Sequence, residues 1–126
     1  MKNSIIICFL ILFASCQPKK LQIANFEVTK VKHFGTIKVG DTINENFEIK
    51  NTSQNILRIK NIKTSCGCTV AGINDSIINP DSTTKIKTQF IADKENIGSI
   101  EKSIVIEANT NPNFTVLYLK GNVVGY

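Results

Sequence analysis

The chain has no tryptophan and only one histidine, and these scarcities narrow the functions that it could have. Arg58 is the single arginine, and the lysines are scattered along the sequence. Proteins that read nucleic acids depend on arginine contacts to bases and on aromatic stacking. We therefore expect no nucleic-acid partner, although the formal net charge is +5. The lone His33 is expected to be a packed or surface residue and not a catalytic base.

Catalytic and nucleotide-binding motifs are missing as well. The sequence contains no nucleophile elbow, phosphate-binding loop, paired-histidine metal motif or dinucleotide fingerprint. Asp41, Asp75, Asp81 and Asp93 all fall in predicted turns, where a short carboxylate accepts backbone hydrogen bonds. We therefore predict a protein that is not an enzyme and that carries no cofactor.

The sequence has no apolar run long enough to span a membrane, and its most notable apolar run lies at the N-terminus. Ile5–Ala14 is a stretch of ten apolar residues after the basic start Met1–Ser4. A helix that spans a bilayer needs about 20 apolar residues. The run is therefore typical of a signal peptide, predicted over residues 1–15.

The end of this leader resembles the lipobox of bacterial lipoproteins. Leu12–Cys16 reads Leu-Phe-Ala-Ser-Cys, and the resemblance implies cleavage before Cys16 and lipidation of Cys16. An ordinary secretory signal that leaves Cys16 as a free thiol is the alternative. Several acyl chains would hold the protein on a membrane, whereas one chain binds only weakly. Residues 16–22 are predicted to be the lipidated cysteine and a polar tether.

The location follows from what comes after the cysteine. Gln17–Lys20 is polar and carries a proline, and it lacks the acidic cluster of surface-displayed lipoproteins from Bacteroidetes-type bacteria. We therefore expect the protein to be anchored in the outer membrane and to face the periplasm.

The rest of the chain, residues 23–126, is predicted to be one all-β domain. Apolar residues alternate in short segments, as in Ile43, Phe47 and Ile49, and turn signals such as Val39-Gly40-Asp41 separate them. Such strands bury their apolar faces between two sheets. We predict an immunoglobulin-like antiparallel β-sandwich of seven or eight strands with Greek-key connections. The strands are expected over about residues 24–32, 34–38, 42–51, 56–64, 68–73, 84–91, 99–108 and 114–123.

Several segments resemble the family called domain of unknown function 1573, or DUF1573. They are His33–Ile37, Phe47–Thr52, Leu57–Thr69 with its Ser-Cys-Gly-Cys-Thr run, and Asn109–Pro112. The resemblance covers about residues 26–121. It implies an immunoglobulin-like sandwich on secreted proteins and lipoproteins without an established activity, related to adhesion-type sandwiches of ciliary and sperm-surface proteins.

The Cys66-Gly67-Cys68 run is the one candidate for chemistry. Residues i and i+2 of a strand lie about 6.6 Å apart, near the ~6.8 Å upper limit for cysteines joined by a disulfide. Three interpretations stay open: a structural pair, a strained redox-active disulfide, or a thiolate site for a soft ion such as Cu(I). Cys66 and Cys68 are thus candidate redox or metal residues, and no closed metal site is predicted.

These observations predict an envelope-anchored lipoprotein whose sandwich is a binding or scaffold module. Its partners would be the membrane, through Cys16, and another envelope protein, through exposed strand edges or loops. The alternative function is a thiol-redox or Cu(I)-handling protein that acts through Cys66 and Cys68.

Overall fold

The structure is a computed structural model that describes residues 14–18, 20–66 and 69–126. Most of the predicted signal peptide, Gly67 and Cys68 therefore lie outside the described residues. The strands are β1 (Phe26–Glu27), β2 (Val31–Lys38), β3 (Thr42–Asn51), β4 (Leu57–Thr64), β5 (Thr69–Ile73), β6 (Ile77–Ile78), β7 (Thr83–Ile91), β8 (Gly98–Ala108) and β9 (Phe114–Val124). A short 3-10 turn, η1 (Lys94–Asn96), precedes β8. The described helical structure includes nothing long and apolar enough to cross a membrane.

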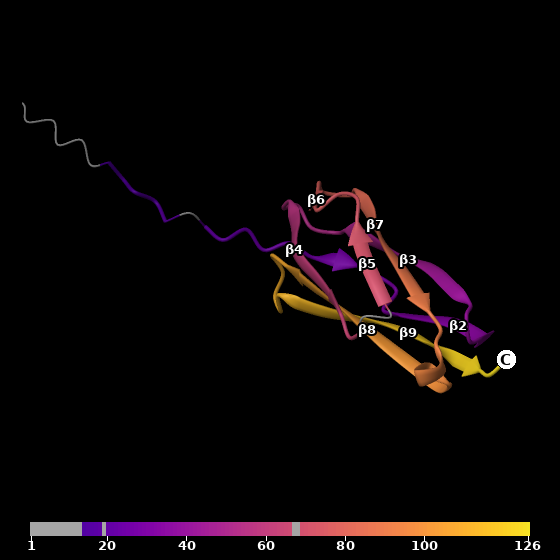
Figure 1. The fold of residues 1–126 in the computed structure, drawn as a ribbon. Helices are drawn as coiled ribbons and strands as arrows, with labels where there is room; N and C mark the ends of the chain where they lie inside the picture. Colours follow the sequence, from indigo (N-terminus) through magenta and orange to yellow (C-terminus); the bar gives the residue numbers. More distant parts are fainter. Residues whose placement is uncertain (1–13, 19, 67–68) are drawn as a thin grey trace, which may run out of the picture.

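The strands form two sheets (Figure 1). One sheet has the order β1-β3-β7-β5, and the other has the order β2-β9-β8-β4-β6. Immunoglobulin domains place their A, B, E and D strands in one sheet and C, F and G in the other. The strands β1, β3, β7 and β5 correspond to A, B, E and D, and β4, β8 and β9 correspond to C, F and G. The predicted all-β immunoglobulin-like sandwich is confirmed.

The apolar alternation of the sequence explains the core. Successive side chains of a strand point to opposite faces, so residues of one parity share a face. The alternating apolar residues of the strands are all buried or packed against the buried core: Ile43, Phe47, Ile49, Leu57, Ile59, Ile86, Phe90, Ile100, Ile104 and Ile106. Antiparallel pairing of β3 with β7 and of β8 with β9 holds these faces in register.

Several details of the prediction need correction. Residues 24–32 were expected to form one strand, but the chain leaves the first sheet after Glu27 and joins the second at Val31. As a result β2 lies parallel to β9, so the sandwich is not purely antiparallel. The expected break near His33 is a bulge within β2, and Gly35 there has a φ of 77°. The two-residue strand β6 was not predicted.

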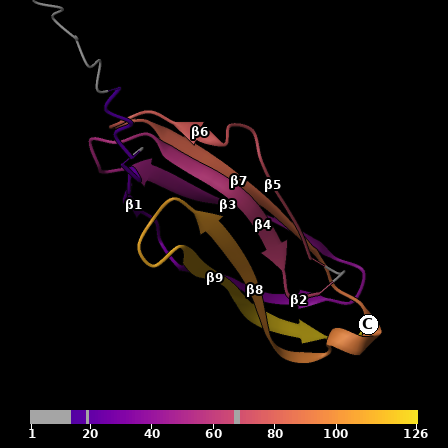
Figure 2. The same cartoon turned by 90° about the vertical axis from the view of Figure 1, so that its left-hand side faces the viewer.

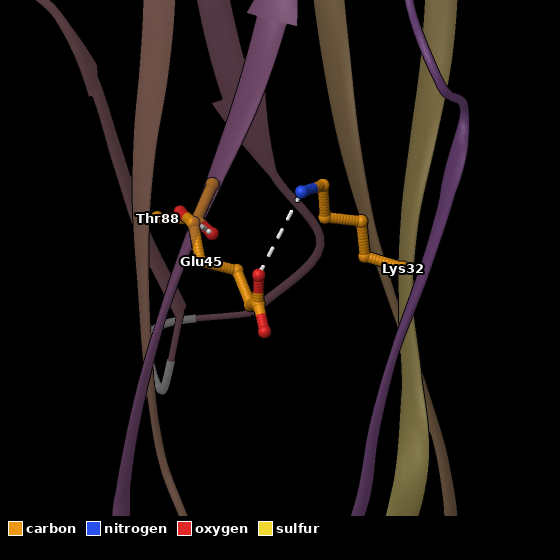
Figure 3. Close-up of polar contacts among 3 residues, drawn as sticks. All are labelled: Lys32, Glu45 and Thr88. Carbon is orange, nitrogen blue, oxygen red and sulfur yellow. Dashed lines mark hydrogen bonds and ion pairs between the residues drawn. The ribbon is translucent and has the colours of Figure 1, made fainter.

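A polar contact closes the side of the sandwich between β2 and β3. Nζ of Lys32 lies 3.8 Å from a carboxylate oxygen of Glu45, which belongs to the opposite sheet (Figure 3). The same ammonium lies 5.9 Å from the ring centroid of Phe47. The hydroxyl of Thr88 donates to the backbone carbonyl of Glu45 at 2.8 Å. Thr88 is buried, whereas the side chains of Lys32 and Glu45 are only partly desolvated at this side of the sandwich.

Three aspartates act as the turn residues that the sequence predicts. Carboxylate oxygens of Asp41, Asp75 and Asp93 accept backbone N–H groups two or three residues away, at 2.9, 3.1 and 3.0 Å. Each bond replaces water at a loop where the strand ladder has ended. No bond of this kind is seen for Asp81 among the described contacts, but its φ of 62° places it in a tight turn.

Candidate functional site

The Cys66 turn joins β4 to β5, and it is built by side chains on both sides of it. Cys66 is half-buried and disulfide-bonded, and its sulfur lies 4.0 Å from the hydroxyl of Thr69. The hydroxyl of Thr64 donates to the carbonyls of Cys66 and Thr69, at 3.3 and 2.9 Å. Cys68, the other candidate, lies outside the described residues.

A second set of contacts fixes this turn to β8. The backbone N–H of Ser65 donates to the carbonyl of Ser103 at 3.0 Å. The N–H of Ser103 returns a bond to the Ser65 hydroxyl at 3.1 Å. The residue before Cys66 is thereby held against one sheet, and Thr69 begins the edge strand of the other.

The structure does not bring His33 to the cysteine. His33 is exposed on β2, and β9 and β8 separate β2 from β4 in the sheet. Three strand spacings amount to roughly 14 Å. Neither His33 nor Cys66 lines the three surface depressions of about 270, 120 and 430 Å³. The described residues contain no group of three or more histidine, cysteine or acidic side chains placed to hold a metal ion.

Cys16 lies at the other end of the molecule. Its thiol is free and exposed in the extended segment that precedes the first strand. Figures 1 and 2 show this segment leaving one end of the sandwich, while the C-terminus lies at the opposite end. The strand β4 runs away from the N-terminal segment, and Cys66 comes just after the end of β4. Cys66 therefore lies toward the end of the sandwich that is opposite the N-terminal segment. Lipidation of Cys16 stays a prediction.

Two asparagines clamp the N-terminal segment to the domain, and sequence reasoning missed both. The side-chain amide of Asn55 donates to the carbonyl of Ile23 at 2.8 Å. The amide of Asn109 donates to the carbonyl of Gln22 at 3.0 Å, and its carbonyl accepts the N–H of Arg58 at 2.7 Å. Asparagine-rich turns are common in this chain, so composition could not single out these positions.

The strand edges differ in how well they could accept another strand. The edge strands β1 and β6 have two residues each, and β2 is interrupted by its bulge. The remaining edge strand, β5, has five residues and pairs with β7 without a register shift. An unpaired edge is a template for strand addition, and shortness or a bulge protects against it. Thus β5 is the most regular open edge of the described sandwich.

The hydrogen bonds of Thr69 show which backbone groups of β5 face outward. Its N–H donates to the carbonyl of Cys66 and its carbonyl accepts the Thr64 hydroxyl, so both groups point away from β7. Backbone groups alternate along a strand. The N–H and carbonyl of Ala71 and Ile73 therefore face the open side.

Residues 24–123 match the family described as "Protein of unknown function (DUF1573)". The chain belongs to this family. The match covers the sandwich from two residues before β1 to the penultimate residue of β9. A comparison with curated proteins finds no sequence that matches this DUF1573 chain.

Solved structures show the same fold at low sequence identity. A protein of unknown function from Porphyromonas gingivalis W83 superposes with a TM-score of 0.73 at 20% identity, over 84% of this chain and 50% of that one. The ASH/PapD-like domain 7 of human CEP192 superposes with a TM-score of 0.64 at 12% identity, over 80% and 86%. The DUF1573 chain thus spans half the length of the Porphyromonas protein. It has a PapD-like, immunoglobulin-like fold.

Proposed function

We propose that this DUF1573 chain is a lipoprotein of the bacterial cell envelope, anchored through Cys16, whose sandwich is a non-catalytic binding or scaffold module. The open edge of β5 carries this proposal. A partner strand would add to β5 through the backbone groups of Ala71 and Ile73, as extended segments add to other sheet edges. The family match and the fold support the sandwich, and they leave its function and its partner open.

The proposed geometry separates the anchor from the binding edge. The N-terminal segment leaves the sandwich at one end, and β5 begins near Cys66 toward the other end (Figure 1). A membrane anchor at Cys16 would therefore leave the start of β5 pointing toward the periplasm. The partner in this proposal is another envelope protein that presents an extended segment.

Photo-crosslinking tests the binding edge. A photoreactive amino acid placed at Gly72 on β5 should crosslink to a second protein in cells that make the full chain. A Cβ at Gly72 meets no atom within 4 Å, so the position has room for a side chain. The same amino acid at His33, on the bulged edge of β2, is the matched control. Crosslinks of equal yield from both positions, or from neither, would contradict the proposal.

Mass spectrometry of the native protein tests the anchor. The proposal expects a chain that begins at Cys16 and carries the added mass of acyl groups, recovered with membranes. A Cys16→Ala variant should lose the acyl mass and leave the membrane fraction. Recovery of a chain that still begins at Met1, without acyl mass and in the cytosol, would refute it.

A thiol-redox or Cu(I)-handling role is the second candidate, and the disulfide at Cys66 favours its redox form. Copper binding needs thiolates, which only the reduced state offers. Alkylation followed by mass measurement, before and after a mild reductant and with and without Cu(I), counts the thiols directly. Cysteines that stay unreactive in the folded protein and bind no copper would eliminate both forms of this candidate.

A further inference from the structure

A basic pocket lies beside the clamped N-terminal segment. It has a volume of about 430 Å³ and is lined by Lys20, Leu21, Gln22, Arg58, Lys60 and Asn109. Three of these residues are cations, and none carries a carboxylate. Asp75 lies near this region because Ile77 pairs with Arg58, but its carboxylate accepts the N–H of Ile77 and does not line the pocket.

Asn109 holds the two walls of this pocket together. Its side-chain amide binds the carbonyl of Gln22, and its side-chain carbonyl binds the N–H of Arg58. Its backbone N–H and carbonyl bond to the Arg58 carbonyl and to the N–H of Ala24, at 3.1 and 2.9 Å. The segment that carries Lys20 is therefore fixed next to β4, and the pocket is a feature of the folded domain.

The pocket lies close to the proposed anchor. The chain from Cys16 to Lys20 reaches at most about 14 Å when fully extended. Acyl chains on Cys16 would thus hold the pocket within reach of the headgroups of the same membrane leaflet. Leu21, which lines the pocket, is 80% exposed, and Ile77 beside Arg58 is 50% exposed. Apolar side chains next to cations suit the boundary between headgroups and acyl chains.

We infer that the pocket formed by Lys20, Arg58 and Lys60 binds the phosphate of an anionic phospholipid, so that this end of the sandwich lies against the bilayer. The planar guanidinium of Arg58 suits the bidentate recognition of phosphate, and the two lysines add charge without fixed geometry. The inference rests on the proposed anchor, because the anchor makes membrane lipid the source of the phosphate.

Binding to vesicles without the anchor tests the pocket itself. Every described strand and core residue lies in residues 24–124, so a chain that begins at Gln17 retains the whole sandwich. This chain is sedimented with vesicles of phosphatidylcholine alone and with vesicles containing phosphatidylglycerol. We expect binding to the anionic vesicles, weakened at high salt because the charges are exposed. An Arg58→Gln, Lys60→Gln variant should bind the anionic vesicles at least about tenfold more weakly.

The control variant makes the same change of charge elsewhere. Lys85 and Lys87 are exposed on the outer face of β7, away from the pocket. A Lys85→Gln, Lys87→Gln variant should lose less than about twofold. Equal losses in the two variants, or no preference for anionic vesicles, would overturn the inference.

Inorganic phosphate distinguishes the two sources of the ligand. At constant ionic strength, millimolar phosphate should leave vesicle binding nearly unchanged, because a bilayer presents many headgroups at once. Saturable binding of phosphate that abolishes vesicle binding would identify a site for soluble phosphate and refute the lipid assignment. The acyl mass of the native protein tests the anchor separately, so either proposal can fail alone.

Discussion

The ring of Phe34 occupies the space where a side chain of Gly121 would lie. A Cβ built on Gly121 would come closer to three ring carbons of Phe34 than real Cβ atoms approach their neighbours. The bulge in β2 brings this ring over β9, and its centroid lies 5.6 Å from that of Phe90 in the other sheet. The missing side chain at Gly121 thus lets an aromatic residue of the edge strand pack against the opposite sheet.

A Gly121→Ala substitution should therefore destabilise the fold. The methyl group would displace the ring of Phe34 from its contact with Phe90, and overpacking of this kind costs about 1–3 kcal/mol. Urea denaturation measures the loss. Gly72→Ala is the control, because a Cβ there meets nothing within 4 Å, and it should change stability by less than about 0.5 kcal/mol. A Gly121→Ala protein as stable as the wild type would show that the ring is not fixed there.

Substitution of Asn51 should also destabilise the fold, for a different reason. Its fully buried amide donates to the carbonyls of Asn55 and Ile78, and its oxygen accepts the N–H and hydroxyl of Ser53. Asn51→Ala leaves two carbonyls without these donors and should cost about 2–4 kcal/mol in urea denaturation. Ser53→Ala removes one hydroxyl and should cost about 1 kcal/mol. Equal costs for the two variants would contradict the bridging role of Asn51.

The sequence predicted the parts of the fold that depend on local periodicity. Alternation in β3, as in Phe47 and Ile49, reports which side of a strand is buried, and the turn at Asp41 reports where the strand begins. Alternation does not report which sheet receives the strand. Phe26 and Val28 share one parity and Val31 has the other, but this change alone does not say that the chain has moved to the second sheet, so the crossing after Glu27 was not foreseen.

At the candidate site, the sequence could not predict contacts between residues that lie far apart along the chain. The Ser-Cys-Gly-Cys-Thr run identified the family segment, but spacing alone could not exclude a contact between Cys66 and His33. The order of strands in the sheet separates them. The basic pocket was also missed, because the segment that carries Lys20 is held beside Arg58 by Asn109, which lies 51 residues beyond Arg58.

The ion pair of Lys32 and Glu45 should contribute little to stability despite its place between the sheets. Both side chains are about one-third exposed, at 33% and 31%, and their charged atoms are 3.8 Å apart. A double-mutant cycle with Lys32→Gln and Glu45→Gln should give a coupling energy below about 1 kcal/mol that falls as salt is added. The outer-face pair Lys120–Glu101 is the comparison. A coupling energy of several kcal/mol would mean that the Lys32 pair is buried more deeply than its exposure indicates.

The two asparagines that hold the N-terminal segment should contribute to stability in proportion to the hydrogen bonds that each makes. Asn109→Ala removes three side-chain hydrogen bonds, to Gln22, Ile56 and Arg58, and should lower the free energy of unfolding by about 2–3 kcal/mol. Asn55→Ala removes the single bond to Ile23, and we expect a loss of about 1 kcal/mol.

Trypsin cleavage after Lys20 measures the same clamp independently of global stability. The rate should rise in both variants and more in Asn109→Ala, since cleavage requires the segment to leave the sandwich. Asn113→Ala, at an exposed position in the same loop, should leave the rate unchanged. If Asn109→Ala were cleaved no faster than Asn113→Ala, the segment would not be held by its side chain, and the basic pocket would lose the wall that carries Lys20.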